Sequence, residues 1–304
     1  MAWESRKRIS ALLEELERLK ALVPSAASSV PELGISEFLA QEFLPAVAAV
    51  EGDLAEAPHL KSWSELLERH RFVAIIAFRG SLKSTLAKAV VAHALRSHQR
   101  GAYDCVYYSA TVDLARWHLR RLKLYLEALA PSWGWRDATS GEAVLRYERA
   151  GAIFTCEPAG LDQASRGRRG NLLVLDDVSD PKKLASMADI QRALEALQRR
   201  ILPLLKDKSA RVLLVGTPLI EGDVIAWAEK NPEFVTVRLP AILSDGSPAW
   251  REKYDRAELE KIRRLVGERS FNAEYLLHAV APTDTFLPPD VVERAILKIG
   301  SDSV

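Results

Sequence analysis

The sequence predicts an α/β fold with a central, mainly parallel sheet, and two observations support this prediction. Short apolar runs alternate along the chain with amphipathic helical runs, the order that gives parallel strands joined by right-handed crossovers. One apolar run also passes through a short turn into a helical segment at Lys83, as a phosphate-binding loop requires. The chain has 304 residues, which is enough for one large domain and a small appendage.

The expected elements follow from hydrophobic periodicity and from Pro and Gly breaks. Before the sheet we expect an amphipathic helix at 9–19, a linker at 24–35, and helices at 38–50 and 60–70. Strands are expected at 72–77, 104–109, 152–156, 171–176 and 211–216, with helices at 84–98, 112–130 and 187–206. A later helical segment at 256–277, divided at Gly267, predicts a small C-terminal subdomain.

These elements predict four divisions of the chain. They are an N-terminal helical segment at 1–57, a core at 58–238, a small subdomain at 239–290 and a tail at 291–304. Two cysteines, Cys105 and Cys156, lie in apolar strand-like runs, so we expect buried, reduced thiols in a cytosolic protein. We expect no zinc site, membrane span or signal peptide, because the required spacings and apolar runs do not occur.

The overall charge does not point to nucleic acid, since 42 Lys and Arg residues nearly balance 41 Asp and Glu residues. Contact with DNA would need local basic patches. Two helices offer such patches: Arg116, His118, Arg120, Arg121 and Lys123 on one, and Arg199, Arg200, Lys206 and Lys208 near the other. For most of these residues we favour the alternative of an ordinary solvated face.

The candidate phosphate loop comprises Arg79, Gly80, Ser81, Leu82, Lys83, Ser84 and Thr85. Backbone N–H groups of the turn and the positive end of the helix would hold phosphates, with the Lys83 ammonium on the β- and γ-phosphates. The Ser84 hydroxyl would bind Mg²⁺. The pattern is imperfect, because Leu82 and Ala77 stand where the usual motif has glycine.

An apolar run at 171–176 predicts a strand buried on both faces, and it ends in Asp176 and Asp177. Acids at this edge of a parallel sheet lie where such sheets hold their ligands. Asp176 would orient the Mg²⁺ shell, and Asp177 would polarise the attacking water as a general base. The alternative is a pair of solvated turn acids.

Two further strands end in small polar residues, namely Ser109 and Thr111 after one and Gly216 and Thr217 after the other. In this order they resemble the motor motifs of P-loop helicases and translocases. Polar groups at these positions would sense the γ-phosphate and couple its state to movement.

Taken together, these motifs resemble the ATPase half of large terminase subunits, the DNA-packaging motors of tailed bacteriophages. The resemblance covers roughly 58–290 and includes the phosphate loop, Ser109-Ala110-Thr111, Leu175-Asp176-Asp177, Gly216-Thr217-Pro218-Leu219, Leu239-Pro240-Ala241-Ile242 and the segment 267–276. It implies a RecA-type P-loop (ASCE) NTPase with Walker A and Walker B motifs, N-terminal helices and a C-terminal lid near 240–280.

The resemblance also implies a function. The protein would hydrolyse ATP with Mg²⁺ and move double-stranded DNA into a procapsid in the host cytoplasm. Its partners would be the portal protein, the procapsid and the small terminase subunit. It would form a homo-oligomeric ring on the portal and be a monomer in isolation. A P-loop helicase or remodeller, and a nucleotide-binding module with weak turnover, are the alternatives.

An arginine finger is a further implication. Arg166, in an Arg-Gly pair about ten residues before Asp176, would reach the γ-phosphate of a neighbouring subunit. Arg168, Arg169 or Arg79 could take this role instead, the last acting in cis. For the loop of Arg166 the alternative is a solvated basic turn, and for Arg79 it is a salt bridge to a nearby carboxylate.

The remaining expectations concern the base and the nuclease. His59 and Trp63 could stack on adenine, although such residues more often pack in a core. Asp177 replaces the Glu that family members often carry. Full large terminases continue into an RNase H-like nuclease domain, whereas this chain ends at Val304. We therefore expect no nuclease activity from it.

Overall fold

The computed structural model describes residues 32–140, 144–161, 169–180 and 186–279. Its centre is an eight-stranded sheet in the order β3-β4-β5-β2-β6-β7-β1-β8. The strands are β1 Phe72–Ala77, β2 Gly101–Ser109, β3 Arg136–Asp137, β4 Leu145–Arg149, β5 Ala152–Gly160, β6 Leu172–Asp176, β7 Arg211–Gly216 and β8 Val235–Leu239. All pairings from β5 to β8 are parallel, and only β3–β4 and β4–β5 are antiparallel. The mainly parallel sheet predicted from the sequence is confirmed.

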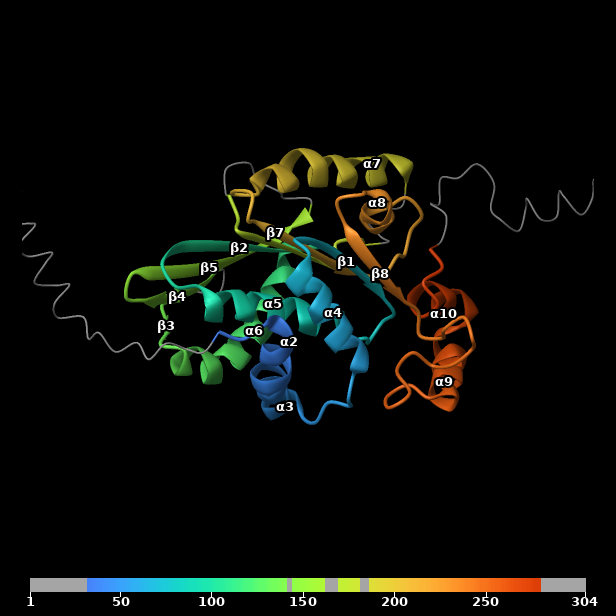
Figure 1. Cartoon of the computed structure of the whole chain (residues 1–304). Coiled ribbons are helices and arrows are strands. Elements are labelled where there is room, and N and C mark those ends of the chain that lie inside the picture. Colours follow the sequence, from blue (N-terminus) through green and yellow to red (C-terminus); the bar gives the residue numbers. More distant parts are fainter. Residues whose placement is uncertain (1–31, 141–143, 162–168, 181–185, 280–304) are drawn as a thin grey trace, which may run out of the picture.

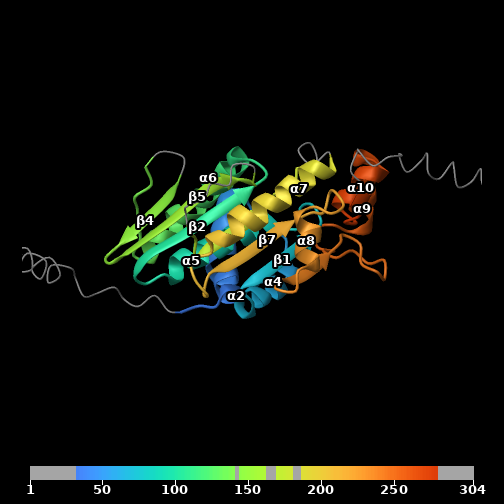
Figure 2. The same cartoon turned by 90° about the horizontal axis from the view of Figure 1, so that it is seen from above.

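Helices cover both faces of the sheet (Figures 1 and 2). The helices below the sheet in Figure 1 are α2 Ile35–Phe38, α3 Leu44–Glu51, α4 Pro58–Arg69, α5 Lys83–Ser97 and α6 Val112–Ser132, with a π-helical turn at Leu39–Phe43. Above it lie α7 Met187–Ala196 and α8 Val224–Lys230, and at one end of the sheet lie α9 Arg256–Val266 and α10 Glu268–Glu274. The expected helix at 9–19 falls outside the described residues.

The sequence-based expectations agree with these elements at most positions. All five predicted strands form, although β2 and β5 are longer than expected. The helical run from Met187 changes to a π-helical turn at Leu197–Ile201 and a 3₁₀ turn at Leu202–Leu204. Gly267, with φ of 82°, separates α9 from α10 as predicted. The division points of the chain at 57, 238 and 290 remain predictions.

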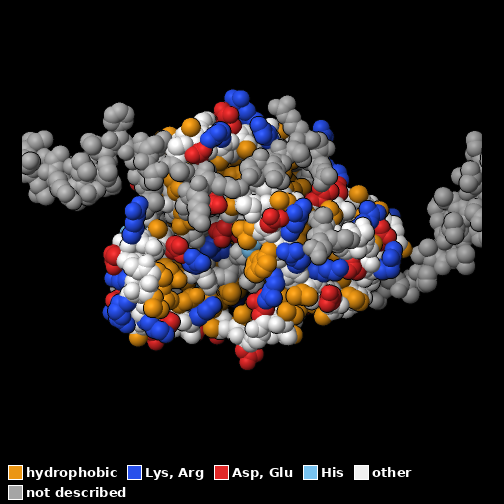
Figure 3. Space-filling model, turned by 180° about the vertical axis from the view of Figure 1, so that it is seen from behind, with side chains coloured by type: hydrophobic (Ala, Val, Ile, Leu, Met, Phe, Trp, Pro, Cys, Tyr) orange, Lys and Arg blue, Asp and Glu red, His pale blue; other side chains and the backbone are white. Residues whose placement is uncertain are grey.

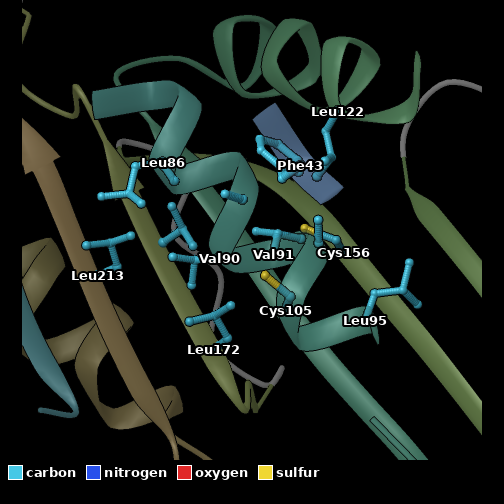
Figure 4. Close-up of a cluster of buried hydrophobic side chains, with 14 of the residues drawn as sticks. Phe43, Leu86, Val90, Val91, Leu95, Cys105, Leu122, Cys156, Leu172 and Leu213 are labelled. Carbon is cyan, nitrogen blue, oxygen red and sulfur yellow. The ribbon is translucent and has the colours of Figure 1, made fainter. Parts of the chain in front are cut away.

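Two hydrophobic clusters, one on each face of the sheet, hold the layers together. The cluster shown in Figure 4 has α5 at its centre. Leu86, Val90, Val91 and Leu95 of α5 pack against strand residues such as Leu172 and Leu213. Each such buried side chain contributes about 1.5–3 kcal/mol relative to exposure. This packing fixes the start of α5 against the sheet, and with it the phosphate loop.

The same cluster contains residues of other segments. Phe38, Phe43 and Val47 place the N-terminal helices in the core that α5 and α6 also share. Cys105 and Cys156 face each other on β2 and β5, and both are buried free thiols, as predicted. Among the described helices none is long and apolar enough to cross a membrane.

Candidate functional site

The loop between β1 and α5 forms a tight turn next to Tyr254. Gly80 has φ of 87°, and a Cβ atom at this position would overlap the Tyr254 hydroxyl and lie 3.2 Å from Tyr254 Cζ. Glycine is therefore required here both by backbone conformation and by space. Leu82 directly before α5 has φ of 67°, a left-handed conformation that costs about 1–2 kcal/mol for a residue with a side chain. Such strain is concentrated at functional sites.

The polar groups of this loop are directed inward. Lys83 is buried, and its Nζ lies 3.4 Å from the carbonyl oxygen of Phe78, to which it donates. The buried Ser81 hydroxyl has no protein partner within the described residues. His59 Nε2 lies 2.9 Å from the Ser81 carbonyl oxygen. A buried ammonium and an unpartnered hydroxyl beside a helix start are the groups that a phosphate would satisfy.

Asp176, at the end of β6, meets Ser84 at the start of α5. The Ser84 hydroxyl donates to Asp176 Oδ1 at 2.8 Å, and Asp176 is fully buried. Tyr107 of β2 donates its hydroxyl to Asp176 Oδ2 at 2.5 Å. Burial and the neighbouring carboxylate raise the pKa of Tyr107 well above its ordinary value, so its hydroxyl stays protonated and donates. The structure therefore brings together the two residues predicted to hold Mg²⁺.

Asp177 lies beside this pair and differs from it in environment. Its φ of 46° turns the backbone sharply at the end of the strand, and its amide donates to the Val215 carbonyl at 3.0 Å. Burial raises the pKa of Asp177, with Lys83 opposing and Asp176 adding to this shift. A carboxyl group of raised pKa is a suitable proton acceptor near neutral pH. Complete burial of Asp176 argues against a pair of solvated turn acids.

The four residues predicted to couple nucleotide state to movement lie at or just after the ends of β2 and β7. Thr217, after β7, donates its hydroxyl at 2.9 Å to the carbonyl of Ala77, the last residue of β1 before the phosphate loop. A Cβ on Gly216 would lie 2.6 Å from Ile225 Cδ1 and 3.5 Å from Asp177 Oδ1. Ser109 is buried at the end of β2, and Thr111 caps α6 by accepting from Leu114 N at 3.2 Å. Their coupling role remains a prediction.

Of the two arginines proposed for catalysis, only Arg79 belongs to the described residues. Arg79 is exposed and forms a salt bridge of 2.7 Å to Glu274 of α10, the alternative that the sequence left open for it. Its backbone amide also donates to the Glu274 carbonyl at 2.9 Å. Arg166 and Arg168 lie outside the described residues, and Arg169 is exposed.

His59 and Trp63, the predicted adenine-binding residues, belong to an aromatic group next to the phosphate loop. Their ring centroids are 4.6 Å apart, and His59 also lies 5.2 Å from Trp250 of the C-terminal subdomain. Only 2% of the Trp63 surface is exposed. In this arrangement Trp63 packs in the core, and His59 contacts the phosphate loop at the Ser81 carbonyl. Their contact with a base remains a prediction.

Two buried residues lie near Asp176 that were not predicted from the sequence to do so, Lys88 and His118. The latter was grouped with the basic patch of its helix, but it is 6% exposed, with Nε2 3.6 Å from Asp176 Oδ2. Burial and the nearby Lys88 ammonium lower the pKa of His118 to about 3. The available signal was helical spacing, because His118 falls three residues after Ala115 and four before Leu122, both on the buried face of α6.

Three partly exposed basic side chains of α6 are paired with acids. Arg116 contacts Asp113 at 2.9 Å, Arg121 contacts Glu51 at 2.8 Å and Lys123 contacts Asp137 at 3.1 Å. Basic and acidic groups are also intermixed on the face shown in Figure 3. This arrangement is typical of a solvated face. Within the described residues no group of three or more His, Cys, Asp or Glu side chains could hold a metal ion.

Comparisons with known proteins identify the fold. No protein-family model and no curated protein matches the sequence. Among solved structures, the large terminase of bacteriophage HK97 has a TM-score of 0.56 and 13% identity, over 81% of this chain and 55% of that chain. The large terminase ATPase domain of Thermus phage P74-26 has a TM-score of 0.53 and 16% identity, over 71% and 92%.

The large terminase of a thermophilic bacteriophage, in complex with ADP, has a TM-score of 0.52 and 11% identity over 74% of this chain and 53% of that chain. This chain thus spans about half the length of that protein and of the HK97 large terminase. At these identities the likeness is one of fold. The chain has the RecA-like fold of large terminase ATPase domains, as the sequence predicted.

Proposed function

We propose that this chain is an ATP-hydrolysing motor domain of viral double-stranded DNA packaging, of the large terminase type. One observation carries the proposal: Ser84 and Asp176, 92 residues apart, meet at 2.8 Å at the C-terminal edge of a RecA-like sheet, beside the buried Lys83. Nucleotides bind at this edge in open α/β sheets. The large terminase of the thermophilic bacteriophage, which shares the fold, is described as a complex with ADP.

The residues present fit ATP with Mg²⁺. Ser84 and Asp176 offer the oxygen ligands that this ion prefers, and Lys83, Ser81 and the start of α5 offer cationic and N–H or O–H donors for phosphate oxygens. Bound Mg²⁺ would neutralise phosphate charge. Within the protein, Lys83 would hold the β- and γ-phosphates, and Asp177 would accept a proton from the attacking water.

Completion of the site would require an arginine. In the proposal Arg166 of one subunit reaches the site of its neighbour in a ring, and Arg79 is the candidate in cis. A guanidinium on the γ-phosphate stabilises charge that develops in the transition state. The salt bridge with Glu274 occupies Arg79 in this structure, which favours an arginine from outside the subunit.

The partners belong to the same proposal. They are double-stranded DNA, the portal protein with its procapsid, and the small terminase subunit, met in the host cytoplasm. The chain would work as a homo-oligomeric ring on the portal and be a monomer in isolation. Contacts with DNA phosphates would be independent of sequence and sensitive to salt.

Subunit mixing tests both the activity and the position of the arginine. ATP hydrolysis per subunit is measured from dilute to concentrated protein, with and without double-stranded DNA, and we expect it to rise on assembly. Arg166→Ala and Lys83→Ala proteins should partly restore hydrolysis when mixed, because each supplies the group that the other lacks. Full activity at high dilution without complementation would place the arginine in cis. No hydrolysis under any condition would refute the proposed motor.

The absence of nuclease activity is a separate part of the proposal. Terminase nuclease chemistry needs several carboxylates around two metal ions. Purified protein incubated with plasmid DNA and Mn²⁺ should leave the DNA intact. Cleavage that co-purifies with the protein and is lost on mutation of one of its carboxylates would contradict this expectation.

A further inference from the structure

The two carboxylate oxygens of Asp176 have different neighbours. Oδ1 accepts from the hydroxyl of Ser84, the residue proposed to bind Mg²⁺, at 2.8 Å. Oδ2 accepts from the Tyr107 hydroxyl at 2.5 Å and lies 3.6 Å from His118 Nε2. One oxygen therefore faces the metal position, and the other is enclosed by side chains of the protein.

The orientation of the His118 ring follows from its second neighbour. Lys88 Nζ lies 3.4 Å from His118 Nδ1. An ammonium group only donates, so Nδ1 accepts and the ring hydrogen is on Nε2, the nitrogen that faces Asp176. Lys88 is 5% exposed and His118 6%, so water does not replace these contacts. A separation of 3.6 Å exceeds a hydrogen bond, and such contacts often shorten when the ligand binds.

Three elements converge on this carboxylate. Helix α5 supplies Ser84 and, one turn later on the same face, Lys88. Strand β2 supplies Tyr107, whose ring centroid is 5.5 Å from that of His118 at an angle of 30°. Helix α6 supplies His118 and begins directly after Thr111. The orientation of Asp176 thus depends on how α5 and α6 are seated against the sheet.

We propose that His118 and Lys88 are positioning residues that hold Oδ2 of Asp176 so that Oδ1 is presented to the magnesium ion bound with ATP. This inference rests on the proposed function and adds two residues to its site. Groups that orient a metal ligand through a hydrogen bond typically change metal affinity by about 10- to 100-fold when removed. Both residues are buried and would act only through Asp176, so nucleotide affinity without metal should not change.

The test measures metal binding directly. Mn²⁺ binding to the full chain saturated with ADP is followed by the electron paramagnetic resonance signal of free Mn²⁺, and ADP affinity is measured separately without metal. His118→Leu should weaken Mn²⁺ binding about tenfold and leave metal-free ADP affinity unchanged. His118→Gln, which retains an N–H donor of similar reach, should recover most of the loss. Lys88→Met should resemble His118→Leu, because the tautomer of His118 is no longer fixed.

Matched controls exist on the same helices. His93 of α5 is a partly buried histidine whose Nε2 lies 2.9 Å from the Leu33 carbonyl, away from Asp176. Tyr125 of α6 donates to a carboxylate, that of Glu51, as Tyr107 does to Asp176. His93→Leu and Tyr125→Phe should keep wild-type Mn²⁺ affinity to within about twofold, whereas Tyr107→Phe should lose it as His118→Leu does.

The outcomes separate this inference from the proposed function. Wild-type Mn²⁺ affinity in a folded His118→Leu protein overturns the inference. If His118→Leu does not fold, Lys88→Met decides: a tenfold loss supports the inference, and wild-type affinity overturns it. An equal loss in His118→Leu and His93→Leu also overturns it, since the effect would then be general loosening. If the wild-type chain binds no nucleotide, the proposed function itself fails.

Discussion

Arg79 in the phosphate loop and Glu274 in α10 are 195 residues apart in the sequence, and Arg79 Nη1 donates to Glu274 Oε2 at 2.7 Å. The Arg79 side chain is 69% exposed, so water screens the pair, and its contribution to stability is about 0–1 kcal/mol. Its importance is positional, because it joins the C-terminal subdomain to the loop that would hold the phosphates. Glu274 also competes with any phosphate for the guanidinium.

Glu274→Gln should therefore increase ATP hydrolysis while hardly changing stability. Releasing a pair of at most about 1 kcal/mol corresponds to an increase of up to about fivefold if Arg79 then reaches the γ-phosphate. Steady-state hydrolysis and thermal unfolding are the measurements. Glu229→Gln is the control, because Glu229 forms an equivalent 2.7 Å pair with Arg238 away from the loop. Reduced hydrolysis in Glu274→Gln alone would mean that the pair is required for the active loop conformation.

Lys83→Ala should abolish ATP hydrolysis without unfolding the protein. Lys83 is the buried ammonium at the start of α5, whereas Arg79, the other cation of this loop, is exposed and paired with Glu274. Hydrolysis should fall to background, with far-ultraviolet circular dichroism unchanged. Lys61→Ala, which removes an exposed lysine of the nearby α4, should behave as wild type. Near-normal turnover in Lys83→Ala would disprove the assignment of the phosphate loop.

The strands and helices of the core were predictable because each is long and strongly apolar on its buried side. The three strands that the sequence did not indicate are the two edge strands, β3 and β8, and β4, which lies next to β3. β3 has two residues, and β8 is only half-buried, so neither carries a strong pattern. β4 has five residues, of which only Leu145 and Tyr147 are buried, and one of its two neighbours is the two-residue strand β3. Edge strands expose one side to water, which weakens the periodic signal.

The candidate site was predictable where motif and position coincide, as for Ser84 and Asp176. It was not predictable where the role of a residue depends on tertiary contact. His118 was assigned by its type to a basic patch, yet its place on the buried face of α6 decides its environment. The Arg79–Glu274 pair joins segments whose local patterns contain no information about each other. Sequence periodicity specifies which face is buried, but not which buried polar groups meet.

Asp177→Asn should lose ATP hydrolysis and gain stability at neutral pH. Burial, with Asp176 adding, raises the folded-state pKa of Asp177 above its ordinary value of 3.8. The folded protein therefore holds this proton more tightly than the unfolded chain does. The free energy of unfolding consequently falls as pH rises from about 4 through the raised pKa. Asparagine avoids this ionisation and also tolerates a φ of 46°.

The measurement is the Tm of both proteins as a function of pH. At pH 7 we expect Asp177→Asn to unfold at a higher temperature than wild type. The difference should vanish below about pH 4. Asp207→Asn is the control of opposite sign, because hydrogen bonds from Ser209 lower the pKa of Asp207. A higher Tm for wild type at pH 7 would contradict the raised pKa of Asp177.

Gly80→Ala should destabilise the protein more than Gly222→Ala does. Both glycines have positive φ, 87° and 78°, so alanine costs about 1–2 kcal/mol of backbone strain at either position. Only at Gly80 would the added Cβ also overlap a side chain, the Tyr254 hydroxyl, whereas nothing lies within 4 Å at Gly222. The difference between the urea unfolding midpoints of the two variants measures the stability lost through the overlap with Tyr254.

A second substitution tests whether the Tyr254 hydroxyl causes the additional destabilisation of Gly80→Ala. Tyr254→Phe removes the overlapping oxygen, so it should restore part of the stability of Gly80→Ala and leave Gly222→Ala unchanged. The recovery is incomplete because the ring carbon Cζ still lies 3.2 Å from the new Cβ and the backbone strain persists. Wild type, Gly80→Ala, Tyr254→Phe and the double variant form a double-mutant cycle. A coupling energy of about 0.5–3 kcal/mol is expected for groups in contact. Equal destabilisation of Gly80→Ala and Gly222→Ala, with no coupling to residue 254, would show that the C-terminal subdomain does not pack on the phosphate loop in solution.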